Sequence, residues 1–276
     1  MTTPPKQGYS KYYNIRNLPK KNMKIGIFDS GVGGLTVLKA LREELPSVDF
    51  FYLGDTARVP YGGKSKETIQ RYSLECAEFL LSFGVELLVV ACNTASAYAL
   101  EALKDKLSIP VIGVIQPGVE KAIKISKQKK IGVIGTRGTI QSKAYQKLLE
   151  SYGAQVFAKA CPLFVPLVEE GILNGTIAKS VIEYYLQELK GKIDTLILGC
   201  THYPLLKEPI KQFMGEVDVV DSAEAVAKKV SQIARNEGEG NLRLFFTDNS
   251  PNLRAMIRLI LGQDLKFEIV PVLCRL

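Results

Sequence analysis

The chain has 276 residues, of which 46% are hydrophobic and 23% are charged. This composition supplies the apolar material of a buried core, so it excludes disordered, collagen-like and low-complexity proteins. No apolar run approaches the roughly 18 residues that a membrane helix needs. At about 150 residues per domain, the length predicts one large or two compact domains. The five cysteines are dispersed and odd in number, which is typical of a reducing compartment, and we expect a soluble, cytoplasmic protein.

The 36 basic and 28 acidic residues give a net charge of +8, which a nucleic-acid partner would explain. Residues 1–22 carry five basic residues, no acidic residue and no periodic pattern, so we expect a disordered basic tail there. Residues 23–276 then hold 31 basic and 28 acidic residues, a net charge of +3. The body of the chain is nearly balanced, and we predict no nucleic-acid and no membrane partner for it.

From Met23 onward, short β-branched runs alternate with amphipathic segments, which is the pattern of a parallel sheet with crossover helices. The fold class is therefore α/β. In chain order, strands are predicted at residues 24–28, 49–53, 85–91, 130–134 and 193–199. Helices are predicted around residues 35–41 and 69–83, directly after 92–94, and at 222–236 after the run 217–220. The segments 242–247, 251–261 and 266–270 would then complete the first half.

Two parts of the sequence resemble each other. Residues 24–30 are similar to 130–136, and the run before Cys92 is similar to the run before Cys200, at offsets of 106 and 108. The repeat predicts two pseudo-symmetric domains, each a mostly parallel sheet flanked by helices, with the active site in the cleft between them. We expect domain one to be discontinuous: residues 23–114 plus 229–276 form domain one, and residues 115–228 form domain two.

Polar residues gather where the predicted strands end. In open parallel sheets, ligands bind beyond the carboxyl ends of the strands. Four polar groups follow such ends, and two facing halves would bring them to one cleft: Asp29-Ser30, Cys92-Asn93-Thr94, Gly135-Thr136 and Cys200-Thr201-His202. This convergence is the main functional signal of the sequence.

Two of the cysteines have the context of a functional site. Cys92 and Cys200 each stand at a strand-to-helix turn, where the positive end of a helix lowers the pKa of a thiol. The alternative is a pair of buried structural thiols. His202 could accept the proton of Cys200 or donate one to a bound anion. A metal site is disfavoured because Cys200-Thr201-His202 has no second, closely spaced pair of ligands.

Asp29 has three interpretations. It could cap the following helix, bind a substrate ammonium, or assist Cys92 by hydrogen bonding or by accepting its proton. A nearby carboxylate raises the pKa of a thiol, so it would not activate Cys92 by its charge. The glycine cluster at residues 31–34 fails the dinucleotide fingerprint, because Thr36 occupies the position of the third glycine. What remains is a turn whose N–H groups suit a carboxylate or phosphate.

Four motifs in this order closely resemble those of the bacterial glutamate racemases, in the aspartate/glutamate racemase family. They are Phe28-Asp29-Ser30-Gly31-Val32-Gly33-Gly34-Leu35-Thr36, Gly54-Asp55-Thr56 with Pro60-Tyr61-Gly62, Ala91-Cys92-Asn93-Thr94-Ala95-Ser96, and Gly199-Cys200-Thr201-His202-Tyr203-Pro204. The resemblance runs from Met23 to about residue 270, which predicts Met23 as the natural start. The loop at residues 136–139 departs from the small, Ala-containing version that is typical of the family.

The resemblance implies a cofactor-independent racemase that interconverts L- and D-glutamate by a two-cysteine, two-base 1,1-proton transfer and supplies D-glutamate for peptidoglycan. It implies no metal. The acid/base residues would be Cys92 and Cys200, assisted by Asp29, His202 and Glu169. The substrate-binding residues would be Asp29, Ser30, Tyr61, Gly62, Asn93, Thr94, Thr136, Thr201 and His202. Helix-start N–H groups and hydroxyls would hold the carboxylates, so an arginine clamp is unnecessary.

Other functions stay open on the sequence alone. Aspartate and hydantoin racemases share the two-thiol arrangement, although His202 and the loop at residues 29–31 favour glutamate. A binding protein for an acidic amino acid or phosphate is a second class, and a nucleic-acid or regulatory module that uses the basic tail is a third. For the racemase we expect a homodimer whose partner is the small-molecule substrate glutamate.

Overall fold

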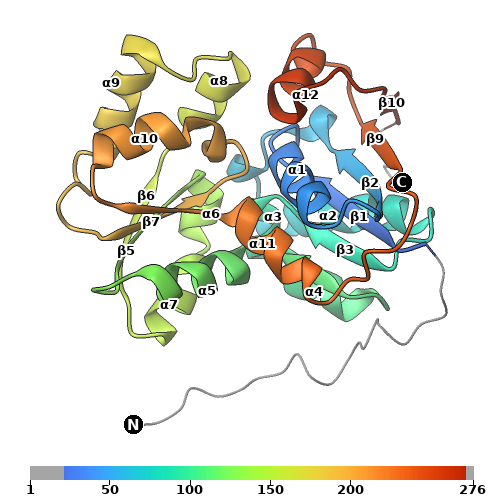
Figure 1. The fold of residues 1–276 in the computed structure, drawn as a ribbon, viewed down its shortest axis with the longest axis horizontal. Coiled ribbons are helices and arrows are strands. Elements are labelled where there is room, and N and C mark those ends of the chain that lie inside the picture. Colours follow the sequence, from blue (N-terminus) through green and yellow to red (C-terminus); the bar gives the residue numbers. More distant parts are fainter. Residues whose placement is uncertain (1–21, 272–276) are drawn as a thin grey trace.

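The structure is a computed structural model, and it describes residues 22–271. Within that range the strands form two sheets, and every pairing in them is parallel (Figure 1). The predicted basic tail, apart from Asn22, lies outside the described residues, as does Cys274. No helix of the described part is long and apolar enough to cross a membrane.

The first sheet has six strands in the order β10-β9-β2-β1-β3-β4. These are β1 (Lys24–Asp29), β2 (Asp49–Gly54), β3 (Leu87–Val90), β4 (Val111–Gly113), β9 (Leu242–Phe246) and β10 (Glu268–Ile269). β3 has the sequence LLVV and is buried on both faces, as expected of a central parallel strand. The C-terminal part of the chain thus returns to the sheet that the N-terminal part began.

The second sheet has four strands in the order β6-β5-β7-β8. These are β5 (Lys130–Gly135), β6 (Gln155–Ala160), β7 (Thr195–Gly199) and β8 (Asp218–Asp221). The α/β fold with two parallel sheets is confirmed. The domain boundaries themselves stay predictions.

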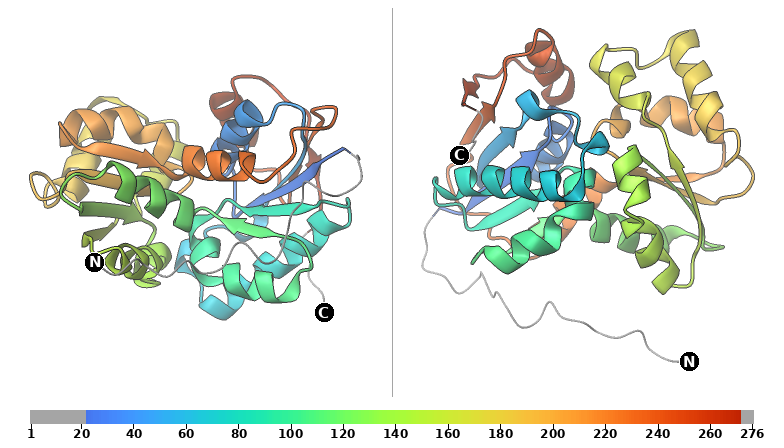
Figure 2. Two further views of the ribbon diagram at one scale, coloured as in Figure 1. Left: turned by 60° about the horizontal axis from the view of Figure 1, so that its bottom comes forward. Right: turned by 180° about the vertical axis from the view of Figure 1, so that it is seen from behind.

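Helices follow nearly every strand. They are α1 (Leu35–Glu44), α2 (Lys66–Leu81), α3 (Asn93–Tyr98), α4 (Leu100–Lys106), α5 (Ile115–Ile125), α6 (Arg137–Gln141), α7 (Ala144–Ser151), α8 (Phe164–Glu169), α9 (Gly175–Leu186), α10 (Lys207–Met214), α11 (Ser222–Ser231) and α12 (Leu253–Leu261). Short 3-10 turns are η2 (Thr56–Arg58), η3 (Tyr61–Gly63) and η4 (Tyr203–Leu206). The protein has two halves, one built on each sheet, and Figure 2 shows them side by side from two further directions.

The two halves are joined by an apolar contact between α1 and α11. Leu38 and Leu41 of α1 are buried in one cluster with Val226 and Val230 of α11. This cluster extends into both halves, so burial of apolar surface holds them together. The contact sets the orientation in which the strand ends of one sheet face those of the other.

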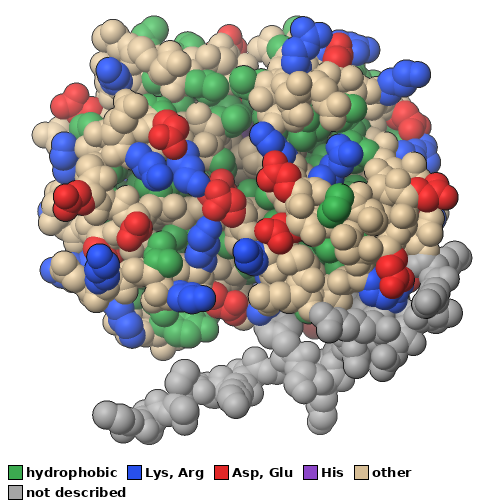
Figure 3. Space-filling model, viewed as in Figure 1, with side chains coloured by type: hydrophobic (Ala, Val, Ile, Leu, Met, Phe, Trp, Pro, Cys, Tyr) green, Lys and Arg blue, Asp and Glu red, His purple; other side chains and the backbone are tan. Residues whose placement is uncertain are grey.

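Charged side chains are mixed over the surface. On the face shown in Figure 3, Lys and Arg side chains are interspersed with Asp and Glu and form no continuous basic area. Several of them are paired, such as Lys121 and Lys207 with Glu224 at 2.8 and 2.9 Å. This pattern matches the nearly balanced charge of residues 23–276.

Candidate active site

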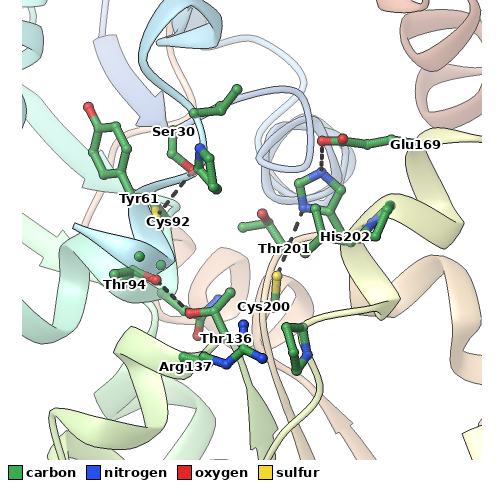
Figure 4. Close-up of a pocket in the computed structure, with 18 residues that line it drawn as sticks. Ser30, Tyr61, Cys92, Thr94, Thr136, Arg137, Glu169, Cys200, Thr201 and His202 are labelled. Carbon is green, nitrogen blue, oxygen red and sulfur yellow. Dashed lines mark hydrogen bonds and ion pairs between the residues drawn. The ribbon is translucent and has the colours of Figure 1, made fainter.

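A cavity of about 350 Å³ lies between the two halves (Figure 4). It is lined by Ser30, Val59, Pro60, Tyr61, Gly62, Gly63, Cys92, Asn93, Thr94, Thr136, Arg137, Pro162, Val165, Pro166, Glu169, Cys200, Thr201 and His202. The polar groups after β1, β3, β5 and β7 all reach this cavity, as the strand-end argument predicted. All the predicted site residues line it except Asp29.

The sheet register explains why these groups meet. In the first sheet Phe28 pairs with Val90, so Asp29-Ser30 and Cys92 leave the sheet at the same edge. In the second sheet Gly135 pairs with Gly199, which places Thr136 beside Cys200. Figure 4 shows Cys92 and Cys200 on opposite sides of the cavity. One thiol therefore comes from each half.

Cys92 is a buried thiol at the start of α3. Its Sγ caps the helix by accepting the N–H of Ala95 at 3.4 Å, and it donates to Ser30 Oγ at 3.5 Å. The pKa of Cys92 is raised to about 12 by burial and, to a smaller extent, by the charge of Asp29, while these two hydrogen bonds oppose the shift. The prediction of a lowered pKa was wrong for this thiol, because desolvation outweighs the helix start.

Cys200 lies in a chain of three groups. Its Sγ is 3.9 Å from His202 Nδ1, and His202 Nε2 is 3.1 Å from Glu169 Oε1. Burial alone would lower the pKa of His202, but the hydrogen bonds to Cys200 and Glu169 raise it to about 10. A protonated His202 is thus favoured at neutral pH, with Glu169 as its counter-ion.

Asp29 stands behind the cavity wall. Its Oδ2 accepts the N–H groups of Gly31 and Gly34 at 3.1 and 2.9 Å, in the turn that leads into α1, so it caps this turn. Its Oδ1 is 3.5 Å from Thr201 Oγ1, across the boundary between the halves. Burial raises the pKa of Asp29, while the charge of His202 and the N–H groups oppose that shift.

Gly33 permits a close approach between the halves. A Cβ atom at this position would lie 2.4 Å from Thr201 Oγ1 and 2.5 Å from His202 Nδ1. Such contacts are shorter than van der Waals packing allows. The glycine turn therefore serves to seat the Thr201-His202 segment against α1, which explains the cluster that failed as a dinucleotide motif.

Three threonine hydroxyls from the two halves form a group. Thr94 Oγ1 is 2.9 Å from Thr136 Oγ1 and 3.0 Å from Thr139 Oγ1, and the latter two are 3.0 Å apart. Thr139 was not among the predicted site residues, although it stands one helical turn after Thr136. A Cβ atom at Gly62 would lie 2.8 Å from Thr136 Cβ, so this contact also requires glycine.

Tyr61 forms part of the cavity wall, but its hydroxyl points away from the cavity (Figure 4). The side chain is 1% exposed, and the hydroxyl donates to Asp55 Oδ2 at 2.5 Å. Asp55 also accepts Arg58 Nε at 2.7 Å and the hydroxyl of Thr247 at 2.9 Å. This buried network, in which Arg58 also pairs with Glu75, fixes the loop that carries Gly62. Any contact of Tyr61 with substrate involves its ring or backbone.

Asn93 is held from the other half of the protein. Tyr145, on α7, donates its hydroxyl to Asn93 Oδ1 at 2.7 Å. Asn93 Nδ2 is buried and has no partner in the described structure. The Asn93 side chain therefore has an unused N–H donor at the cavity wall.

Sequence reasoning missed two sets of cavity residues. One is the apolar set Val59, Pro162, Val165 and Pro166, while Pro60 and Gly63 flank the predicted Tyr61 and Gly62. The other is Arg137, which stands within the loop that departs from the family pattern. That departure was the available signal for Arg137, whereas nothing in the sequence marks the apolar set.

The fold and the site together define a class: a two-domain α/β protein with paired thiols at an interdomain cavity. Comparison with known proteins identifies one family within this class. The Asp/Glu/Hydantoin racemase family matches residues 28–230. A protein of Aquifex pyrophilus named glutamate racemase is 66% identical over 242 residues, 88% of this chain and 95% of the relative. One of Aquifex aeolicus with the same name is 63% identical over 247 residues, 90% of this chain and 97% of the relative.

Solved structures agree in fold. The glutamate racemase of Aquifex pyrophilus has a TM-score of 0.81 at 64% identity, covering 90% of this chain and 98% of that chain. That of Francisella tularensis in complex with D-glutamate has a TM-score of 0.83 at 36% identity, covering 91% and 98%. The chain belongs to the Asp/Glu/Hydantoin racemase family. The family resemblance seen in the sequence is thereby confirmed.

Proposed function

We propose that this protein is an amino-acid racemase that interconverts L- and D-glutamate without a cofactor. The observation that carries the proposal is the placement of one thiol from each half on opposite sides of a single cavity. The names of the relatives at 66% and 63% identity support glutamate as the substrate, as does the D-glutamate in the Francisella tularensis structure.

Inversion at Cα needs a base on one face and an acid on the other. The thiolate on one side takes the Cα proton, and the C–H electron pair stays on the substrate as a carbanion. The thiol on the other side then gives its proton to the opposite face of Cα. The number of protons is unchanged, and the two cysteines have exchanged protonation states, so the reverse reaction uses them in the opposite order.

The two thiols have different surroundings. The raised pKa of Cys92 keeps it a neutral thiol, able to donate a proton. Cys200 lies against His202, whose raised pKa gives this thiol a cationic hydrogen-bond partner that Cys92 lacks. Glu169 keeps His202 protonated and is a positioning residue in this scheme.

The substrate would be held by neutral polar groups around the thiols. The hydroxyls of Ser30, Thr94, Thr136 and Thr201 line the cavity with the amide of Asn93 and the backbone of Gly62. The resemblance to the family further leads us to propose that the product supplies peptidoglycan synthesis and that the enzyme acts in the cytoplasm as a homodimer.

Racemisation of L-glutamate in deuterated water tests the proposal. The purified protein, without added pyridoxal phosphate or metal, should form D-glutamate that carries deuterium at Cα. The variants Cys92→Ala and Cys200→Ala should lose this activity. Cys161→Ala is the matched control, since Cys161 is also a buried thiol but does not line the cavity. Undiminished turnover in either of the first two variants would overturn the two-thiol assignment.

A further inference from the structure

Arg137 stands out among the residues of the cavity. It is the single Lys or Arg in the described cavity wall, and Glu169 is the single Asp or Glu. Arg137 is the first residue of α6, and Thr136 caps that helix by accepting the N–H of Thr139 at 3.3 Å. Its backbone is thus fixed beside the hydroxyl group of Thr94, Thr136 and Thr139. In Figure 4 the side chain extends below Thr136 toward the side that carries Cys200.

Arg137 has no ionic partner among the described residues of the cavity wall. The carboxylate of Glu169 pairs with His202 at 3.1 Å, so these two charges compensate each other. Asp29 lies behind the wall and is not part of the lining. Within residues 22–271 the Arg137 guanidinium forms no ion pair or hydrogen bond, and the side chain is exposed. The thiolate of the proposed reaction adds one negative charge and makes the described cavity wall neutral in sum, so Arg137 is distinguished by the lack of a contact partner and not by an excess of positive charge.

Apolar residues make up another part of the cavity wall. Pro162, Val165 and Pro166 line the same cavity as Arg137 and offer no counter-charge. Low-dielectric walls focus the potential of a charge into a cleft and raise the local concentration of the opposite charge. The site is thus arranged to attract an anion that has a free carboxylate.

We propose that Arg137 is a specificity-determining residue that recognises the negative charge of a dicarboxylic amino acid, through its side-chain carboxylate. This inference rests on the proposed function and deepens it. Glutamate has a net charge of −1 at neutral pH, whereas glutamine has none. The neutral hydroxyls around the thiols can orient either molecule, and Arg137 supplies the preference for the acidic one.

The test compares Arg137→Met, Arg137→Lys and Arg137→Glu in racemisation of L-glutamate. A charge pair at about 6–8 Å is worth roughly 2-fold to 100-fold in binding, depending on the distance and the local dielectric. We expect KM to rise by that factor in Arg137→Met, further in Arg137→Glu, and little in Arg137→Lys, with kcat within about 2-fold of wild type. Lys147→Met is the matched control, because it removes one exposed charge from the next helix, α7.

Salt dependence separates charge from shape. In wild type and in Arg137→Lys, kcat/KM should fall as ionic strength rises, and in Arg137→Met the slope should be much smaller. The dissociation constant of L-glutamate, measured by calorimetry, should follow KM. Racemisation by the wild type tests the proposed function. The ratio of the L-glutamate dissociation constants of Arg137→Met and wild type tests the role of Arg137, even if no turnover occurs. Equal KM and dissociation constants in wild type and Arg137→Met would overturn the inference.

Discussion

Removal of the Glu169 carboxylate should lower the pKa of His202. Glu169 Oε1 lies 3.1 Å from His202 Nε2, and this hydrogen bond is one cause of the raised value of about 10. A hydrogen bond to a charged group is worth about 1.5–3 kcal/mol. The Glu169 side chain is 43% exposed, so water screens the pair and the lower end applies. At about 1.36 kcal/mol per pKa unit, Glu169→Gln should lower the pKa by roughly one unit.

The assay is unusually direct, because His202 is the one histidine of the chain. Its imidazole resonances can be followed by NMR from pH 5 to 11 without assignment. Wild type should titrate well above the ordinary value of 6.5, and Glu169→Gln should titrate roughly one unit below wild type. Glu170→Gln, at the neighbouring exposed position, is the control and should match wild type. A wild-type pKa near 6.5, or no shift in Glu169→Gln, would refute the reasoning.

Three further predictions concern stability and packing. The folded-state pKa of His202 is raised, so the contribution of His202 to the free energy of unfolding should be complete below pH 6.5 and lost as the pH rises through about 10. Chemical denaturation at several pH values can measure this loss. Tyr61→Phe leaves the buried Asp55 with one hydrogen bond fewer and should cost about 1–3 kcal/mol in urea unfolding, together with a higher KM; unchanged unfolding would contradict the network. Gly33→Ala should reduce activity at least tenfold while circular dichroism shows that the fold is retained, because the added Cβ would lie 2.4 Å from Thr201 Oγ1. Wild-type activity in this variant would show that the neighbouring side chains can move away.

The sequence predicts the parts of the structure that depend on local pattern. The strands that precede the polar site groups were predicted because parallel strands buried on both faces are short, continuous apolar runs, as in β3. β6 has no predicted counterpart, since it is an edge strand whose residues are half-buried or exposed and whose pattern is weak. The cavity followed from general topology, because parallel strands end at one edge of a sheet.

What could not be predicted depends on contacts between distant residues. The pKa of Cys92 rises because burial and Asp29 act on it together, and neither is visible from a strand-to-helix turn. The anchor of the Tyr61 loop includes Thr247, 192 residues beyond Asp55 in the chain. The proposed role of Arg137 depends on the pairing of Glu169 with His202, because this pairing leaves Arg137 without an ionic partner in the described cavity wall. Only the assembled cavity reveals this pairing.

The central claim, that two thiols act on opposite faces of Cα, is tested most directly by isotope exchange at early times. The enzyme is incubated with L-glutamate in deuterated water, and both enantiomers are recovered before equilibrium. Two distinct bases predict deuterium at Cα in nearly all of the D-glutamate and almost none in the remaining L-glutamate, because the proton removed and the deuteron added belong to different groups. Equal early labelling of both enantiomers would mean that one group serves both faces, and it would contradict this account.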